Sequence, residues 1–210
     1  MHIYAFGSIC RGDVSADSDV DLLAIVDGFD SRFDPNVYSV YSYQRINEIW
    51  AEGNPFAWHL AIESRLLFSS DGLDLLRLKG KPSRYRACRQ DCEKFQTLFL
   101  DARSSMMDDT VTRTFDLSMV FLAIRNFATC FSLGCSNIPD FSRHSAIRIG
   151  ERSLSIPLEA YRILERARIL CTRGHGPAIN DEEAQMAARH FPGIEEWMNT
   201  LLLEVSCRGT

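Results

Sequence analysis

The sequence predicts an α/β (α+β) protein, in which a small mixed sheet flanked by helices is followed by an all-α C-terminal helical bundle. Short apolar runs bounded by turn residues occupy the first third of the chain, which is typical of strands. From about Asp71 onward, apolar residues recur at spacings of three and four, the period of amphipathic helices. We therefore expect two domains, residues 1–80 and residues 81–210.

The first domain is expected to alternate strands with short helices. Its expected strands are Ile3–Phe6, Val20–Val26, Val37–Tyr43 and a segment within Phe56–Phe68. Residues 22–26 are apolar on both faces, which favours a central strand. A helix is expected over Arg45–Glu52, because Gly53-Asn54-Pro55 follows it as a stop signal.

The second domain is expected to consist of helices. One face of a first long helix is formed by Tyr85, Cys88, Cys92, Phe95 and Phe99. The later helices are expected over Phe115–Leu133 before Gly134, over Leu158–Thr172 before Gly174, after the N-cap Asn180, and over Ile194–Val205. The break at Gly80-Lys81-Pro82-Ser83 is the expected domain boundary.

The composition is that of a folded protein. With 46% hydrophobic and 24% charged residues, the 210-residue chain can bury a core. It lacks an uninterrupted apolar run of roughly 18 to 20 residues and a signal-peptide pattern, so we expect no membrane partner and a cytoplasmic location. The seven cysteines are odd in number and form no Cys-x-x-Cys pair, which favours reduced, buried thiols.

Charge is distributed unevenly along the chain. Residues 1–76 carry four Arg or Lys and twelve Asp or Glu, whereas residues 77–94 carry seven and two, a local balance of +5. The basic segment has two readings that sequence leaves open. It is either the solvated face of a helix or a surface for phosphate, belonging to a triphosphate tail or to an RNA acceptor such as tRNA.

Two aspartates form the candidate metal site. Asp19 and Asp21 are two residues apart at the start of an expected strand, so their side chains project from one face, with Cα atoms roughly 6 to 7 Å apart. Two carboxylates so placed repel each other unless a cation lies between them. Mg²⁺ binds such hard oxygen ligands, with substrate phosphates and water completing its shell.

A phosphate site is expected beside this pair. Gly7 and Ser8 lie at the end of the preceding strand, where glycine permits close backbone approach and the serine hydroxyl can face a phosphate. Arg11 follows one short helical turn later, and it either contacts phosphate or pins the loop. Asp13 and Asp17 are expected to be solvated loop acids.

These residues together resemble the signature of a known superfamily. Gly7-Ser8, Arg11-Gly12 and Ser18-Asp19-Val20-Asp21-Leu22 are similar to the motif of DNA polymerase beta-type nucleotidyltransferases. The short sheet resembles the minimal nucleotidyltransferase branch, which includes aminoglycoside nucleotidyltransferases and the antitoxin halves of bacterial toxin–antitoxin pairs. The resemblance covers roughly residues 3–68.

The resemblance implies an enzyme that transfers a nucleoside monophosphate from a nucleoside triphosphate, such as ATP, to a hydroxyl and releases pyrophosphate. Asp19 and Asp21 would bind Mg²⁺ or Mn²⁺, and Gly7, Ser8 and Arg11 would bind the nucleotide. The acceptor would be a small molecule, an RNA or a partner protein. The helical half would form one wall of the acceptor site or a homodimer contact.

The chain departs from the superfamily pattern at the third carboxylate. The segment Asn36–Ser42, where a neighbouring strand would supply it, contains no acid. Glu63, expected in the next strand, is the nearest replacement, against the plainer reading of a surface salt bridge. His59 is expected to be a hydrogen-bonded core histidine. The missing acid leaves an alternative function open, that of a catalytically weak or inactive antitoxin-like module that retains the fold and acts by binding a partner.

Arginines within the expected helices also have two readings. Arg125 interrupts a nearly continuous apolar run, and Arg168 shares a face with Tyr161 and Leu164. A buried arginine needs a partner. Each would either form an internal salt bridge or face the cleft and contact phosphate or acceptor.

Overall fold

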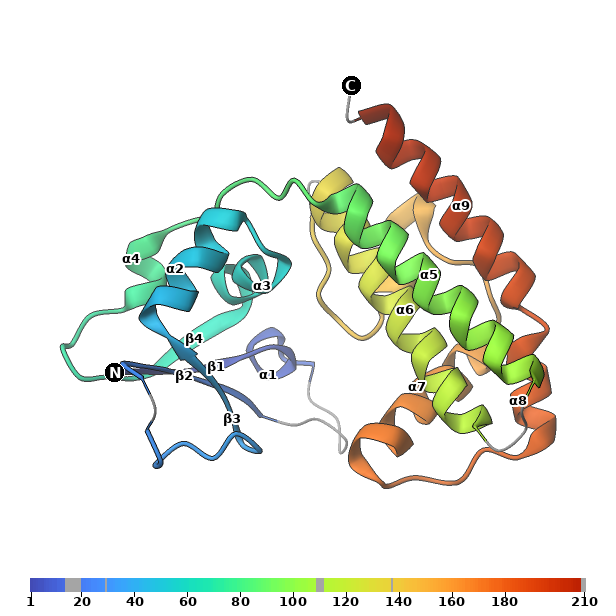
Figure 1. Ribbon diagram of the computed structural model, residues 1–210, viewed down its shortest axis with the longest axis horizontal. Helices are drawn as coiled ribbons and strands as arrows, with labels where there is room; N and C mark the ends of the chain where they lie inside the picture. The colour runs from blue at the N-terminus through green and yellow to red at the C-terminus, as the bar shows by residue number, and fades with distance from the viewer. Residues whose placement is uncertain (14–19, 29, 109–111, 137, 209–210) are drawn as a thin grey trace. The chain divides into compact units, whose positions relative to one another are not determined.

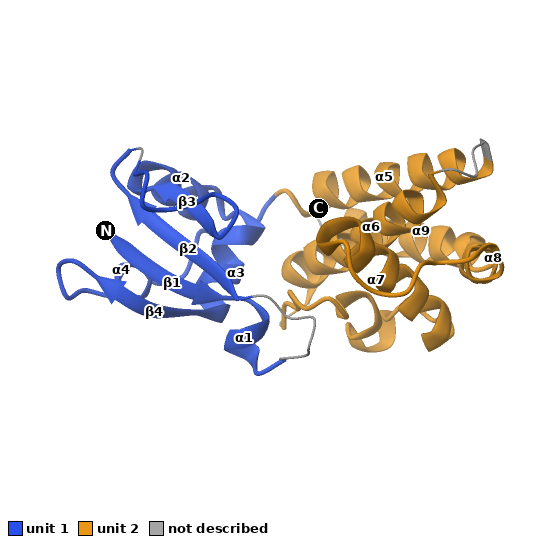
Figure 2. Ribbon diagram, turned by 90° about the horizontal axis from the view of Figure 1, so that it is seen from below, with its two compact units in different colours: residues 1–86 blue, residues 87–210 orange. Residues whose placement is uncertain are grey.

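The protein is described by a computed structural model over residues 1–13, 20–28, 30–108, 112–136 and 138–208 (Figure 1). It divides into two compact units, residues 1–86 and residues 87–210 (Figure 2). The first unit contains a sheet with helices, and the second is helical. The expected fold class is therefore confirmed.

The first unit is built on a four-stranded mixed sheet. Its strands are β1 (His2–Phe6), β2 (Asp21–Val26), β3 (Tyr38–Ser42) and β4 (Ser64–Ser69), in the order β3-β2-β1-β4. β1 runs antiparallel to β2 and β4, and β2 runs parallel to β3. Residues 23–26 of β2 are at most 3% exposed, which confirms the expected central strand.

Helices cover one face of this sheet. The unit contains α1 (Ser8–Arg11), α2 (Tyr43–Glu52), α3 (Pro55–Glu63) and α4 (Leu75–Lys79). Alternate strand residues such as Phe6, Leu23 and Ile25 pack in one cluster with Ile49 of α2 and Leu60 of α3. The intervening residues of β2 pack in a smaller cluster on the other face.

The segment Phe56–Phe68, expected to contain a strand, holds most of β4 but begins as a helix. The Asn54 side chain accepts a hydrogen bond from the Phe56 N–H at 2.9 Å, and Pro55 occupies the first turn of α3. An Asn N-cap followed by proline is a helix start, so these two residues decide the local structure. β4 begins only at Ser64. Glu63, expected in a strand, is therefore the last residue of α3.

The second unit is a helical bundle. Its helices are α5 (Cys88–Asp108), α6 (Arg113–Cys135), α7 (Leu158–Arg173), α8 (Asp181–Ala188) and α9 (Phe191–Arg208), with short 3-10 turns η1 (Ser145–Ile147) and η2 (Gly150–Arg152). α5, α7 and α9 all pack against α6. Two expected boundaries were wrong: Tyr85 precedes α5, and α6 continues through Gly134. Gly174 ends α7 in a left-handed conformation, as expected.

α6 is the core helix of this unit. By length and composition it is the one helix among the described residues that could cross a membrane, yet 67% of its most apolar window is buried within the protein. Arg125, within α6, donates to the backbone carbonyl of Phe141 at 3.1 Å. This arginine therefore binds loop carbonyls. The sequence analysis offers only an internal salt bridge or a contact in the cleft, so neither of its two interpretations includes this role.

The N-terminus of α8 allows a first stability test. The Asn180 side chain accepts from the Glu183 N–H at 2.9 Å, and the Glu183 carboxylate accepts from the Asn180 N–H at 3.2 Å. This capping box satisfies two backbone donors. Asn180→Ala should lower the free energy of unfolding by about 1 kcal/mol in urea titrations. Asn180→Asp keeps the acceptor oxygen and should retain most of that stability; equal losses in both variants would contradict the capping role.

Candidate active site

The ends of β1 and β2 bring the glycine turn and an aspartate together. Phe6 and Asp21 are paired across the two antiparallel strands, so Gly7 follows β1 where β2 begins. A Cβ placed on Gly7 would lie 2.6 Å from Oδ2 of Asp21. The carboxylate of Asp21 therefore occupies the space that any side chain at position 7 would need.

The backbone of Gly7 provides a second reason for glycine. Its φ of 77° and ψ of −140° define a conformation that L side chains rarely adopt. The Gly7 N–H donates to the backbone carbonyl of Glu63 at 3.1 Å, which continues the pairing of β1 with β4. This turn is thus fixed by the end of α3 on one side and by Asp21 on the other.

Ser8 and Arg11 are the first and last residues of α1, the short helix that follows Gly7. Gly12 ends this helix in a left-handed conformation. The guanidinium of Arg11 forms an ion pair with Glu63, and its Nε donates to Oδ2 of Asp13 at 3.2 Å. The side chain of Arg11 is 21% exposed. The structure therefore shows Arg11 pinning the turn while part of its surface remains accessible.

Glu63 is buried between two partners. Its side chain is 9% exposed, and its carboxylate contacts both Arg11 and the imidazole of His59, whose Nε2 lies 2.9 Å from Oε2. Burial of a carboxylate is costly unless such partners compensate it. The plain expectation of a surface salt bridge for Glu63 was therefore wrong, because the ion pair is internal.

His59 and Cys10 pack around this buried pair. The ring of His59 meets that of Phe6 edge-on at 5.7 Å, as expected of a core histidine. The thiol of Cys10 donates to the Ala5 carbonyl at 3.4 Å, and burial raises the pKa of that thiol. Since a thiol with a raised pKa is a poor nucleophile, Cys10 contributes packing rather than chemistry.

Sequence reasoning missed the link from Arg11 through Glu63 to His59. His59 and Glu63 are four residues apart, the spacing at which side chains meet on a helix. That signal was present in the sequence. It was missed because the segment was assigned to a strand, in which residues four apart are not neighbours.

The remaining candidate ligands are only partly placed. Asp21 is exposed at the first position of β2, whereas Asp19 and Asp17 lie outside the described residues. β3 adjoins β2 and carries no acid, as its sequence Tyr-Ser-Val-Tyr-Ser shows. Within the described part of the chain, no group of three His, Cys, Asp or Glu side chains is arranged to hold a metal ion.

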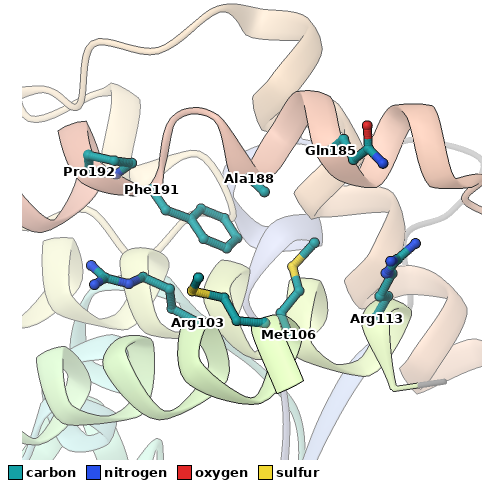
Figure 3. Close-up of a pocket in the computed structure, with 8 residues that line it drawn as sticks. Arg103, Met106, Arg113, Gln185, Ala188, Phe191 and Pro192 are labelled. Atoms are coloured by element: carbon teal, nitrogen blue, oxygen red, sulfur yellow. The ribbon is translucent and has the colours of Figure 1, made fainter. Parts of the chain in front are cut away.

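A separate cavity lies within the helical unit. It has a volume of about 440 Å³ and is lined by Arg103, Met106, Met107, Arg113, Gln185, Ala188, Phe191 and Pro192. Figure 3 shows the Phe191 ring and the Met106 side chain facing each other between the two arginines. Arg103 pairs with Glu195, and Arg113 with Asp181. Because this lining contains no acid, histidine or cysteine, it offers no group for acid–base or metal chemistry.

Comparison with known proteins assigns the first unit to a family. Residues 2–80 match the family model described as the nucleotidyltransferase domain. Neither the comparison with curated proteins nor that with solved structures returned a match. The family match covers the Gly7 turn, the start of β2 and the buried Glu63, the features assembled above. The first unit of this chain is thus a nucleotidyltransferase domain, and the chain that carries it is a transferase enzyme.

Proposed function

We propose that the protein transfers a nucleoside monophosphate from a nucleoside triphosphate, with ATP as the first candidate, to a hydroxyl acceptor in a reaction that depends on a divalent metal. The acceptor oxygen forms a bond to the α-phosphorus, the bond from that phosphorus to the bridging oxygen breaks, and pyrophosphate leaves with the electron pair. The hydroxyl proton passes to a base or to solvent. The observation that carries the proposal is the position of the Asp21 carboxylate, which lies against Gly7 where the turn has no side chain.

The residues at this turn suit a metal-bound triphosphate. Asp21 offers an exposed carboxylate, which is the donor type that Mg²⁺ or Mn²⁺ prefers. We propose Asp19 as the second metal ligand on the strength of the sequence motif. When bound, the metal would neutralise phosphate charge and stabilise the attacking and leaving oxygens. We propose that Gly7 and Ser8 hold the triphosphate: the absence of a side chain at position 7 leaves room for the Asp21 carboxylate, and the Ser8 hydroxyl faces a phosphate.

Arg11 and Glu63 have linked roles in this proposal. We propose that Arg11 contacts a phosphate oxygen with its accessible edge. The carboxylate of Glu63, included among the catalytic candidates, contacts Arg11 and His59. We infer that Glu63 acts as a positioning residue, because its buried charge orients the guanidinium toward the turn.

A double-mutant cycle tests this link. Arg11→Gln should lower kcat/KM for nucleotidyl transfer by roughly 100-fold, because one charged donor to phosphate is lost. Glu63→Gln should lower it by a similar factor, while the double variant should be hardly worse than either single variant. If the two effects multiply instead, Glu63 acts independently of Arg11, as a third carboxylate would.

The reaction class has a direct assay. The purified protein is incubated with α-labelled nucleoside triphosphates, Mg²⁺ or Mn²⁺, and cell extract. Label should move to a small molecule, an RNA or a protein, which identifies the acceptor class, and chelation of the metal should stop the transfer. Label that never moves, together with no triphosphate binding in a titration, would contradict the proposed reaction.

One observation favours the alternative function, that of an antitoxin-like binding module. β3 supplies no acid, and Glu63, the nearest candidate for the missing third carboxylate, is already ion-paired with Arg11. A domain with fewer metal ligands would turn over slowly, which suits an antitoxin-like module that works mainly by binding a partner protein. Tight triphosphate binding without label transfer, combined with stoichiometric capture of a small partner chain, would favour this alternative.

The proposed setting is a reducing compartment, the cytoplasm. No disulfide bond forms among the described cysteines, as is usual for intracellular proteins. The proposed partners are a nucleoside triphosphate, the acceptor and a second copy of the chain in a homodimer. Light scattering of the purified protein would decide between monomer and dimer.

A further inference from the structure

Closely spaced cations end the sequence of the first unit. Residues 77–86, here called the basic strap, run from the last turns of α4 into the segment that follows it (Figure 1). The strap contains five cations and no acid, namely Arg77, Lys79, Lys81, Arg84 and Arg86. This charge contrasts with the excess of acids over residues 1–76.

Four of these cations are not used by the fold. Within the residues that the structure describes, the side chains of Arg77, Lys81, Arg84 and Arg86 make no ion pair or hydrogen bond, and all four residues are exposed. Some other exposed arginines do pair: Arg45 lies 3.0 Å from Glu48, and Arg89 lies 2.8 Å from Glu93. Single exposed cations without a printed ion pair, such as Arg65 and Arg162, also occur elsewhere in the described chain, but the strap gathers four of them within ten residues.

The strap is nevertheless fixed in place. The Ser83 N–H donates to the Trp50 carbonyl at 2.9 Å. The indole N–H of Trp50 donates to the Gly80 carbonyl at 3.0 Å, and that of Trp58 to the Ser83 carbonyl at 3.0 Å. A Cβ on Gly53 would lie 2.4 Å from the Ser83 carbonyl oxygen, so the strap rests directly on the turn between α2 and α3. Its cations therefore project from an ordered backbone, which lowers the entropy lost on binding.

An aromatic ring lies beside these charges. Trp58 is bonded to the strap through its indole nitrogen, and the residue remains half-buried, so part of its ring is accessible. A group of cations by itself would bind any polyanion. A tryptophan face next to them is the second component of surfaces that bind single-stranded nucleic acid, where bases stack on the ring and phosphates meet the charges.

We propose that the basic strap, with Trp58, binds single-stranded RNA. RNA is favoured over DNA because unpaired ends and loops are the form in which RNA is usually recognised. Trp58 and Glu63 are both on α3, five residues or about 7.5 Å apart along the helix axis. If the proposed nucleotidyl transfer is correct, RNA on the strap would have its terminal hydroxyl within reach of the Gly7 turn. The acceptor class would then be RNA, and this last step rests on the proposed function.

RNA binding is tested without any nucleoside triphosphate. The affinity for a labelled single-stranded RNA of about 12 nucleotides is measured by fluorescence anisotropy over a range of KCl concentrations. The triple variant Lys81→Gln, Arg84→Gln, Arg86→Gln should bind roughly 100-fold more weakly at about 0.1 M salt. The slope of log K against log salt should fall by about 2, since each lost phosphate contact removes about 0.7.

The matched control removes three exposed arginines that are already ion-paired, with the substitutions Arg32→Gln, Arg45→Gln and Arg89→Gln. It changes the net charge equally and should keep affinity within a few-fold of wild type. RNA should also quench tryptophan fluorescence, and Trp58→Leu should weaken binding roughly tenfold.

Three results would overturn the proposal. Equal losses in the triple variant and its control would mean that net charge alone matters. Equal affinity for duplex RNA would exclude base stacking on Trp58. Polyglutamate that competes as well as RNA at equal charge would identify an acidic protein as the partner. RNA binding without transfer would support the strap and contradict the proposed reaction, whereas transfer to another acceptor without RNA binding would do the reverse.

Discussion

Asp21→Asn should reduce nucleotidyl transfer by roughly 1,000-fold or more and leave the fold intact. The substitution removes the carboxylate that lies against the Gly7 turn, and an amide cannot supply the negative charge that a divalent metal requires. Because residue 21 is exposed at the start of β2, stability should change little. Initial rates with Mg²⁺ and with Mn²⁺, together with urea titrations, measure the two effects separately.

A second aspartate, just beyond the other end of β2, supplies the control. Asp27 is exposed and follows β2 at its opposite end. Asp27→Asn changes the charge equally and should leave the rate of transfer within a few-fold of wild type. A similar rate loss in both variants would mean that charge over the whole unit, rather than the position of Asp21, supports the reaction.

Gly7→Ala should abolish most activity and also weaken the fold. The added Cβ would lie 2.6 Å from Oδ2 of Asp21, so the carboxylate must move, and a misplacement of about 1 Å can cost 100-fold in rate. The backbone conformation at residue 7, with φ of 77°, adds strain of about 1 to 3 kcal/mol. Thermal unfolding and kcat/KM, measured on the same preparation, report the two consequences.

Gly12→Ala distinguishes strain from contact. Gly12 also has a positive φ, 79°, but a Cβ there would meet no atom within 4 Å. Stability should fall by about 1 kcal/mol while activity, measured well below the melting temperature, stays close to wild type. If Gly12→Ala inactivates the enzyme as fully as Gly7→Ala does, the approach of Asp21 to Gly7 is not what sets the rate.

Much of the sheet was predictable because its signals are local. Residues 22–26 are apolar on both faces of the expected strand, which favours a central strand, and Gly7-Ser8 marks the end of the strand before it. The resemblance to the nucleotidyltransferase superfamily then indicates that the end of the first strand and the start of the second form one site. The approach of Asp21 to Gly7 fits that expectation, although the other ligand, Asp19, lies outside the described residues.

The surroundings of Glu63 were not predictable by the same route. Its segment is apolar throughout, so hydrophobic period alone could not separate helix from strand. The helix start at Asn54-Pro55 decides the matter, and the same residues also form the stop signal of the preceding helix. Likewise the pairing of Arg11 with Glu63 spans 52 residues of sequence, a separation at which charge patterns carry no information.

The position of β1 has a consequence for biosynthesis. This strand lies between β2 and β4, and β4 begins about sixty residues after β1 begins. A nascent chain that has emerged only as far as α2 can pair β1 with β2 but leaves its other edge open. The Gly7 amide and Nη1 of Arg11 acquire their acceptors only when Glu63 arrives, and long-range pairing of this kind forms slowly. Ribosome pausing before residue 64 would therefore expose an unfinished edge, and during translation the proposed nucleotide site should form abruptly rather than by degrees.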